Sequence, residues 1–251
     1  MNTKKMNMEV LVWTALVLLL SYLCYVPMFF EKKGIHISQV LLSAKYLFVT
    51  IPLVVSILFS LKDNHLKKWL WALFAEKINY KAIFSCVIFG SVGLSFSIIY
   101  CLIVRDKDLF TNSYPNALAV VINCSYLFVT ALIEEIAWRG FLLNRITAAK
   151  GKKTSLVYVG IIWAIWHIPM WLIRNSLSLA EMLPLFIWAV LISIVLGMLY
   201  CRFRNIFSVS LLHMIFNICF LAPTGYNIII IFLSLIALLI LLGRKKNECN
   251  I

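Results

Sequence analysis

Apolar runs of roughly 17–25 residues recur along this chain, and short polar segments separate them. A helix needs about that length to cross a ~30 Å hydrocarbon core. The pattern therefore predicts eight membrane-spanning helices, at about residues 10–26, 40–61, 82–104, 117–143, 156–172, 183–200, 206–222 and 227–242. The first run is longer than the apolar region of a signal peptide and is expected to be retained. The predicted fold class is all-α: a polytopic membrane helix bundle forming one transmembrane domain over residues 1–251.

The prolines agree with these boundaries. Those at or near the ends of runs, where a missing N–H costs little, are Pro27, Pro115, Pro184 and Pro223. Pro52 and Pro169 lie within runs, and we expect each to kink its helix. Pro169 should also free the carbonyl of Ile165 from its helical hydrogen bond, beside His167.

Composition supports a membrane protein, because 63% of the residues are hydrophobic and the mean hydropathy is +0.96. The formal charge of +13 is attributed to basic cytoplasmic loops facing anionic lipid, and no nucleic-acid-binding motif is found. With eight spans, sixteen Lys and Arg residues fall on the side of both termini and five on the other side. This asymmetry predicts cytoplasmic termini in a multi-pass protein of the cell membrane. The seven cysteines are dispersed without a CxxC pair and indicate neither a disulfide framework nor a structural zinc site.

Within the predicted spans the only acidic residues are Glu134 and Glu135, and the only histidines are His167 and His213. A buried carboxylate is costly, so each needs a structural partner or a function. At 1.5 Å per residue, Glu134 lies about 13 Å from the cytoplasmic end of its span, His167 about 16 Å and His213 about 10 Å. The shared depth predicts one wet site that opens toward the cytoplasm.

Helical spacing divides these residues further. Asn217 follows His213 by four residues and so lies on the same helix face. Arg139 follows Glu135 by four residues and offers it an ion pair, whereas Glu134 must find its partner on another helix. Structural interpretations remain open for each residue: an orienting ion pair, an interhelical hydrogen bond of a histidine, or packing by Asn217.

The ordered set of Glu134-Glu135-x-x-x-Arg139, an aromatic residue four positions before His167, and His213-x-x-x-Asn217 resembles the CPBP intramembrane proteases. That superfamily includes the type II CAAX prenyl endopeptidases and the Abi bacteriocin-processing and immunity proteins. The resemblance covers about residues 117–222. One departure is Trp163, which stands where the family pattern usually has Phe.

The resemblance implies hydrolysis of a peptide bond in a membrane-associated or lipidated peptide, such as a prenylated protein tail or a bacteriocin precursor. In the preferred scheme no cofactor takes part: Glu134 is the general base for a water that it holds with His167. His213 and Asn217 donate hydrogen bonds to the oxyanion, while Arg139 and Glu135 orient Glu134.

Three alternatives stay open at this point. Zn²⁺ held by Glu134, His167 and His213 would leave Glu135 as the base, although the chain has no HExxH motif. A non-catalytic scaffold or immunity protein would keep the family fold without the chemistry. A proton-coupled transporter would use the same residue types, but the chain shows no repeat relating its halves.

Overall fold

The structure is a computed structural model that describes residues 3–62, 64–75, 80, 83–84 and 117–220. These ranges contain helices and no strand, which confirms the all-α class for this part of the chain. Four helices are long and apolar enough to cross a membrane: Met6–Lys32, Leu118–Lys150, Lys152–Arg174 and Leu179–Phe203. A bent pair brings the number to at most five. The predicted runs 82–104 and 227–242 fall almost wholly or wholly outside the described residues, so the count of eight stays a prediction.

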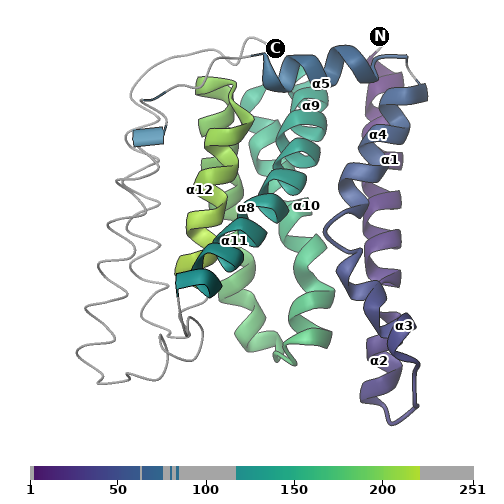
Figure 1. The fold of residues 1–251 in the computed structure, drawn as a ribbon. Helices are drawn as coiled ribbons and strands as arrows, with labels where there is room; N and C mark the ends of the chain where they lie inside the picture. The colour runs from purple at the N-terminus through teal and green to yellow at the C-terminus, as the bar shows by residue number, and fades with distance from the viewer. Residues whose placement is uncertain (1–2, 63, 76–79, 81–82, 85–116, 221–251) are drawn as a thin grey trace.

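Helices from distant parts of the sequence lie side by side in this bundle (Figure 1). The N-terminal helix α1 (Thr3–Leu23) packs on α4 (Ile51–Lys62), and α8 (Ala117–Glu135) packs on α12 (Ile206–Phe220). Between them, α10 (Lys152–Pro169) contacts α1, α9 (Asn144–Lys150) and α11 (Leu179–Phe203). The shorter helix α2 is Val26–Lys32. Helix α10 therefore contacts helices on both sides of the described bundle.

The second predicted run is not one continuous helix. It consists of α3 (Gln39–Leu42), the 3₁₀ turn η1 (Ser43–Tyr46) and α4, with a bend of 68° between the two parts. Pro52 lies in the first turn of α4, where a backbone N–H would have no helical hydrogen bond to lose. The break in the helix therefore precedes the proline. Helix α5 (Leu66–Phe74), which the apolar pattern did not predict, crosses the end of the bundle (Figure 1).

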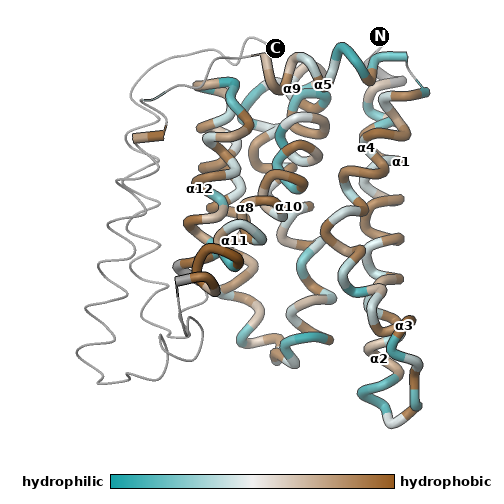
Figure 2. The backbone as a smooth tube through the Cα atoms, in the orientation of Figure 1, coloured by the Kyte–Doolittle hydropathy of each residue, from teal (hydrophilic) through white to brown (hydrophobic). Residues whose placement is uncertain are grey.

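Hydrophobic residues recur along the long helices (Figure 2), and many of their side chains are exposed, as expected of a bundle surrounded by lipid. Val121 and Tyr126 on α8, for example, are 60% and 59% exposed. The interior, in contrast, holds Glu134, Glu135 and Arg139 among buried aromatic rings. Charge inside and hydrocarbon outside is the reverse of a soluble domain, and it directs attention to the buried cluster.

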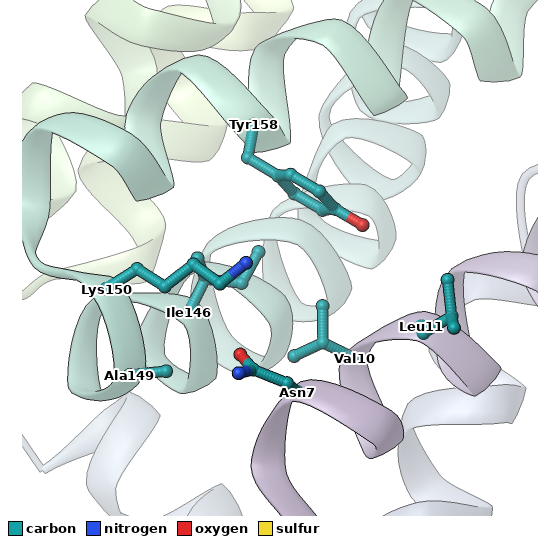
Figure 3. A pocket seen from close by; sticks show the side chains of 7 residues that line it. All are labelled: Asn7, Val10, Leu11, Ile146, Ala149, Lys150 and Tyr158. Atoms are coloured by element: carbon teal, nitrogen blue, oxygen red, sulfur yellow. The ribbon is translucent and has the colours of Figure 1, made fainter. Parts of the chain in front are cut away.

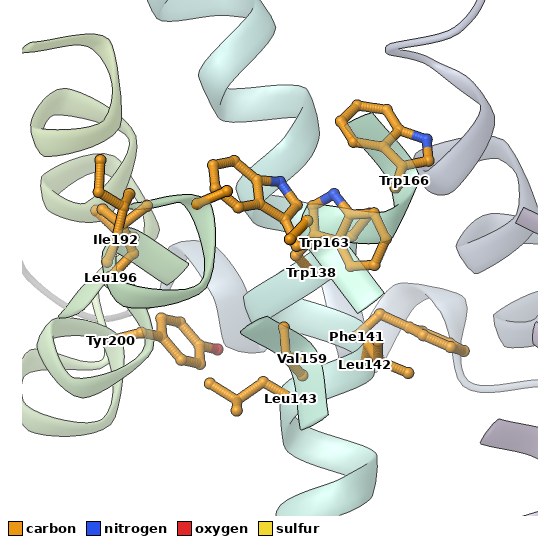
Figure 4. Packing of buried hydrophobic residues seen from close by; sticks show 14 of the residues in the cluster. Trp138, Phe141, Leu142, Leu143, Val159, Trp163, Trp166, Ile192, Leu196 and Tyr200 are labelled. Atoms are coloured by element: carbon orange, nitrogen blue, oxygen red, sulfur yellow. The ribbon is translucent and has the colours of Figure 1, made fainter. Parts of the chain in front are cut away.

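Close approach of α10 and α11 fixes one wall of that cluster. A Cβ atom added at Gly160 would lie 3.1 Å from the carbonyl oxygen of Val190, so only glycine permits this separation without a shift. Small residues at helix contacts are the usual means of tight packing in membranes. Trp163 and Trp166 follow on α10, near Trp138 of the preceding segment (Figure 4). Trp138 and Trp166 meet edge to face, with ring centroids 5.6 Å apart.

Candidate active site

The centre of the cluster is an ion pair within one helical segment. Arg139 Nη1 donates to Oε1 of Glu135 at 2.8 Å, and both side chains are fully buried, which confirms the predicted pair. The other guanidinium nitrogen, Nη2, donates to the hydroxyl of Ser193 at 2.8 Å and to its carbonyl at 3.1 Å. Ser193 lies on α11 and was not among the candidate residues. Arg139 thus ties the carboxylate to a second helix.

His213 joins the same carboxylate from a third helix. Its Nδ1 lies 2.8 Å from Oε1 of Glu135, and only 2% of the residue is exposed. A carboxylate accepts, so Nδ1 carries the proton, and the second ring nitrogen, Nε2, forms no hydrogen bond within the described residues. Asn217, one turn further along α12, is half-buried and forms no hydrogen bond within the described part of the chain. The structure therefore brings His213 to Glu135 and leaves Asn217 beside this contact.

Glu134 has the interhelical partner that its position predicted. The indole Nε1 of Trp163 donates to Oε2 of Glu134 at 3.0 Å, linking α8 to α10. Neighbouring carboxylates thus receive different surroundings: Glu135 meets a guanidinium and an imidazole, and Glu134 meets a neutral donor. Oε1 of Glu134 has no hydrogen-bond partner among the residues that the structure describes.

Trp163 is the residue that sequence reasoning undervalued. It is not among the six candidate residues, but it contacts four of them. Its ring lies 5.4 Å from that of His213 and 4.5 Å from that of His167, and the Arg139 guanidinium stands 5.5 Å from its centroid. The Trp-for-Phe departure was the available signal, because only tryptophan adds an N–H donor at this place.

His167 is the most accessible of the three aromatic site residues. Nδ1 lies 2.7 Å from the backbone carbonyl of Trp163, one turn earlier in α10. A carbonyl cannot donate, so Nδ1 carries the proton and the neutral ring presents the Nε2 lone pair. The ring stacks on Trp171 with centroids 5.5 Å apart and remains half-buried. His167 and Oε1 of Glu134 therefore both offer free acceptors.

The N-terminal helix α1 supplies a hydrogen-bond donor to the backbone carbonyl that Pro169 frees. Tyr22 of α1 donates its hydroxyl proton to the carbonyl of Ile165 at 2.7 Å, and Trp166 Nε1 donates to the Ser21 hydroxyl at 2.8 Å. After Pro169 the helix continues as a π-helical turn, η3 (Met170–Arg174), so the proline changes the helix type instead of ending it. Two adjacent residues of α1 thus hold the backbone around His167.

We expect Tyr22→Phe to destabilise the protein by about 1 kcal/mol, because the freed carbonyl of Ile165 loses its donor in an apolar interior. Thermal unfolding of the purified protein in detergent measures the effect. Tyr126→Phe is the matched control, since its ring is 59% exposed and its hydroxyl forms no hydrogen bond within the described residues. Equal midpoints for the two variants would show that the Tyr22 contact contributes nothing.

A π-helical segment, η2 (Ile136–Leu143), begins directly after Glu135 and carries Arg139. All eight of its residues are buried. π turns recur at functional sites, where they redirect side chains. Trp69 Nε1 and Asn144 Nδ2 donate to the carbonyl of Gly140 at 2.9 and 2.8 Å, which satisfies a backbone group within this irregular stretch. No sequence pattern predicted this change of helix type.

The zinc alternative needs Glu134, His167 and His213 to form one ligand set. Across the described part of the chain, no three His, Cys, Asp or Glu side chains gather so that they would hold a metal ion. The structure thus lends this ligand set no support, and we derive no step of the chemistry through a metal.

Parts of this chain match a family model and a curated protein. Residues 115–219 match the sequence model described as type II CAAX prenyl endopeptidase Rce1-like. A stretch of 50 residues is 30% identical to CAAX prenyl protease 2 of the archaeon Methanococcus maripaludis. That alignment covers 20% of this chain and 18% of the length of the relative. All six candidate residues fall within the matched segment. Residues 115–219 are therefore similar to the type II CAAX prenyl endopeptidases of the Rce1-like family.

Proposed function

We propose that this protein is an intramembrane endopeptidase that cleaves a peptide bond in the tail of a prenylated or otherwise lipidated substrate. The observation that carries the proposal is the buried, hydrogen-bonded cluster of Glu134, Glu135, Arg139 and His213 inside an Rce1-like segment. Charged groups inside a membrane bundle are expensive and are kept where they have a function. The family match favours hydrolysis over proton transport or a scaffold role.

Glu134 is the general base in this proposal. Its free Oε1 and the Nε2 lone pair of His167 are two acceptors that together hold one water by its two protons. Glu134 takes a proton from the water while the water oxygen forms a bond to the carbonyl carbon of the substrate. The same proton then passes to the departing amine nitrogen as the peptide C–N bond breaks. Trp163 holds the carboxylate in place through its indole N–H, 3.0 Å from Oε2.

The hydrogen bond from His213 to Glu135 changes how His213 would stabilise the oxyanion. Because the His213 Nδ1–H is committed to Glu135, the opposite nitrogen donates to an oxyanion only when the ring is an imidazolium. Oε1 of Glu135, 2.8 Å from Nδ1, holds the ring in place. The amide of Asn217, one turn along, donates in either protonation state. Arg139 and Ser193 keep Glu135 oriented toward His213.

The membrane setting forms part of the same proposal. Eight spans, cytoplasmic termini and an opening toward the cytoplasm are supported by the distribution of sixteen against five basic residues between the two sides. The substrate bond would then approach from the cytoplasmic face of the cell membrane. The apolar surfaces of α1 and α8 are consistent with surrounding lipid.

A direct test uses the purified full chain in detergent with a fluorescent farnesylated peptide that ends in a CAAX tail. We expect release of the terminal tripeptide, and a loss of at least about 100-fold in rate for His167→Ala, because the water loses one of its two acceptors. His36→Ala, in an exposed segment away from the cluster, is the control and should retain the wild-type rate. Cleavage by the wild type that persists at full rate in His167→Ala would overturn the proposed role of His167. Absence of cleavage of lipidated peptides by the wild type would overturn the proposed function.

A further inference from the structure

A pocket of about 290 Å³ opens at the end of the bundle where α1 begins, away from the candidate active site (Figure 3). It lies between α1, α9 and α10. Its floor is apolar and includes Val10, Leu11 and Ile146, whereas its rim carries Asn7, Lys150 and Tyr158. In the close view, the ammonium group of Lys150 extends toward the space between α1 and α10 (Figure 3). The pocket thus combines a cation and two hydrogen-bonding groups with a hydrocarbon surface.

The charge of Lys150 is available to a ligand. Its ammonium group has no ion pair or hydrogen bond within the described residues. The nearby acidic residue Glu9 is already paired with Arg145, whose Nη1 lies 2.8 Å from Oε2 of Glu9. That pair also links α1 to α9 beside the pocket. The uncompensated charge at the rim is therefore positive, and it favours an anion.

Exposed apolar side chains lie at or near the pocket-lining residues along α1 and α10. Leu11 on α1 is 58% exposed, and Ile161, one turn beyond Tyr158 on α10, is 40% exposed. A small free anion would leave these apolar side chains without a contact. A molecule with a phosphate at one end and a hydrocarbon chain at the other complements both parts of the site.

We propose that this pocket binds an anionic phospholipid, with the phosphate at Lys150, Asn7 and Tyr158 and an acyl chain along Leu11 and Ile161. Basic pockets between membrane helices near the headgroup level are suited to such lipids. Because the lipid contacts α1, α9 and α10 together, it also braces the packing of the first helix on the others.

The test measures lipid retention by native mass spectrometry of the full chain purified in detergent micelles doped with phosphatidylglycerol or phosphatidylcholine. We expect the wild type to retain phosphatidylglycerol preferentially, and Lys150→Gln to weaken that retention about fivefold, the effect of one lysine near a headgroup. Lys153→Gln is the matched control, because Lys153 is an exposed lysine close by that does not line the pocket.

Three outcomes would overturn the proposal. Equal losses in Lys150→Gln and Lys153→Gln would show diffuse attraction to the basic surface instead of a site. Equal retention of the two lipids by the wild type would remove the selectivity for an anionic headgroup. Displacement of phosphatidylglycerol by millimolar inorganic phosphate would identify a small-anion site. None of these results depends on whether the protein cleaves peptides.

Discussion

Glu134→Gln is expected to lower kcat for cleavage of a prenylated peptide by about 10²–10⁴-fold, the contribution that a positioned general base makes. Glutamine keeps the shape of the side chain and still accepts the Trp163 N–H through its carbonyl oxygen, which replaces Oε2 at 3.0 Å. The variant should therefore fold with an unchanged unfolding midpoint. Steady-state kinetics with the farnesylated peptide, beside thermal unfolding, separates loss of the base from loss of structure.

Trp163→Phe provides the comparison for this result. It restores the aromatic residue usual in the family and removes the donor to Glu134 while leaving the carboxylate in place. We expect a fall of about tenfold in rate, from the loss of one hydrogen bond to a charged group. A Glu134→Gln enzyme that is as active as wild type would exclude Glu134 as the base, whatever Trp163→Phe does.

Arg139→Met is expected to give the largest loss of stability, about 3–5 kcal/mol, because it leaves a fully buried carboxylate without its guanidinium. Glu135 would keep only His213, and its Oε2 already lacks a hydrogen-bond partner among the described residues. The Ser193 hydroxyl and carbonyl would lose their donor too. Denaturant titration of the purified protein in mixed micelles measures the change in the free energy of unfolding.

The double variant Glu135→Gln with Arg139→Met makes the interpretation specific. Its neutral amide needs no counter-charge and still accepts from the His213 ring, so the double variant should be more stable than Arg139→Met alone. A double variant that is less stable than the single one would show that Arg139 acts by filling space and not by neutralising Glu135.

Sequence reasoning performed best where a regular helix decides the geometry. The four-residue spacing of Glu135 and Arg139 predicted their contact, because residues one turn apart share a helix face. The position of Pro169 predicted a freed carbonyl at Ile165, because a ring without an N–H leaves its acceptor alone. The need of Glu134 for a partner on another helix followed from the cost of burying a charge.

Irregular backbone and the choice of partner were beyond the sequence. The π-helical segment after Glu135 and the break before Pro52 depend on tertiary packing, which local patterns do not record. The preferred scheme assigned His213 to the oxyanion, since helical spacing fixed its neighbour Asn217 but not the carboxylate across the gap. Trp163 was not among the candidates, because a tryptophan in an apolar helix is usually there for its bulk.

The Tyr22–Ile165 and Ser21–Trp166 contacts limit which first helix can be combined with residues 115–219. Both hydroxyl groups belong to a helix outside the segment that matches the family model, yet they support the backbone next to a residue inside that segment. A chimaera that joined residues 115–219 to an unrelated first helix would leave a bare carbonyl at the proline turn. Any such chimaera therefore needs a hydrogen-bond donor at the position of the Tyr22 hydroxyl.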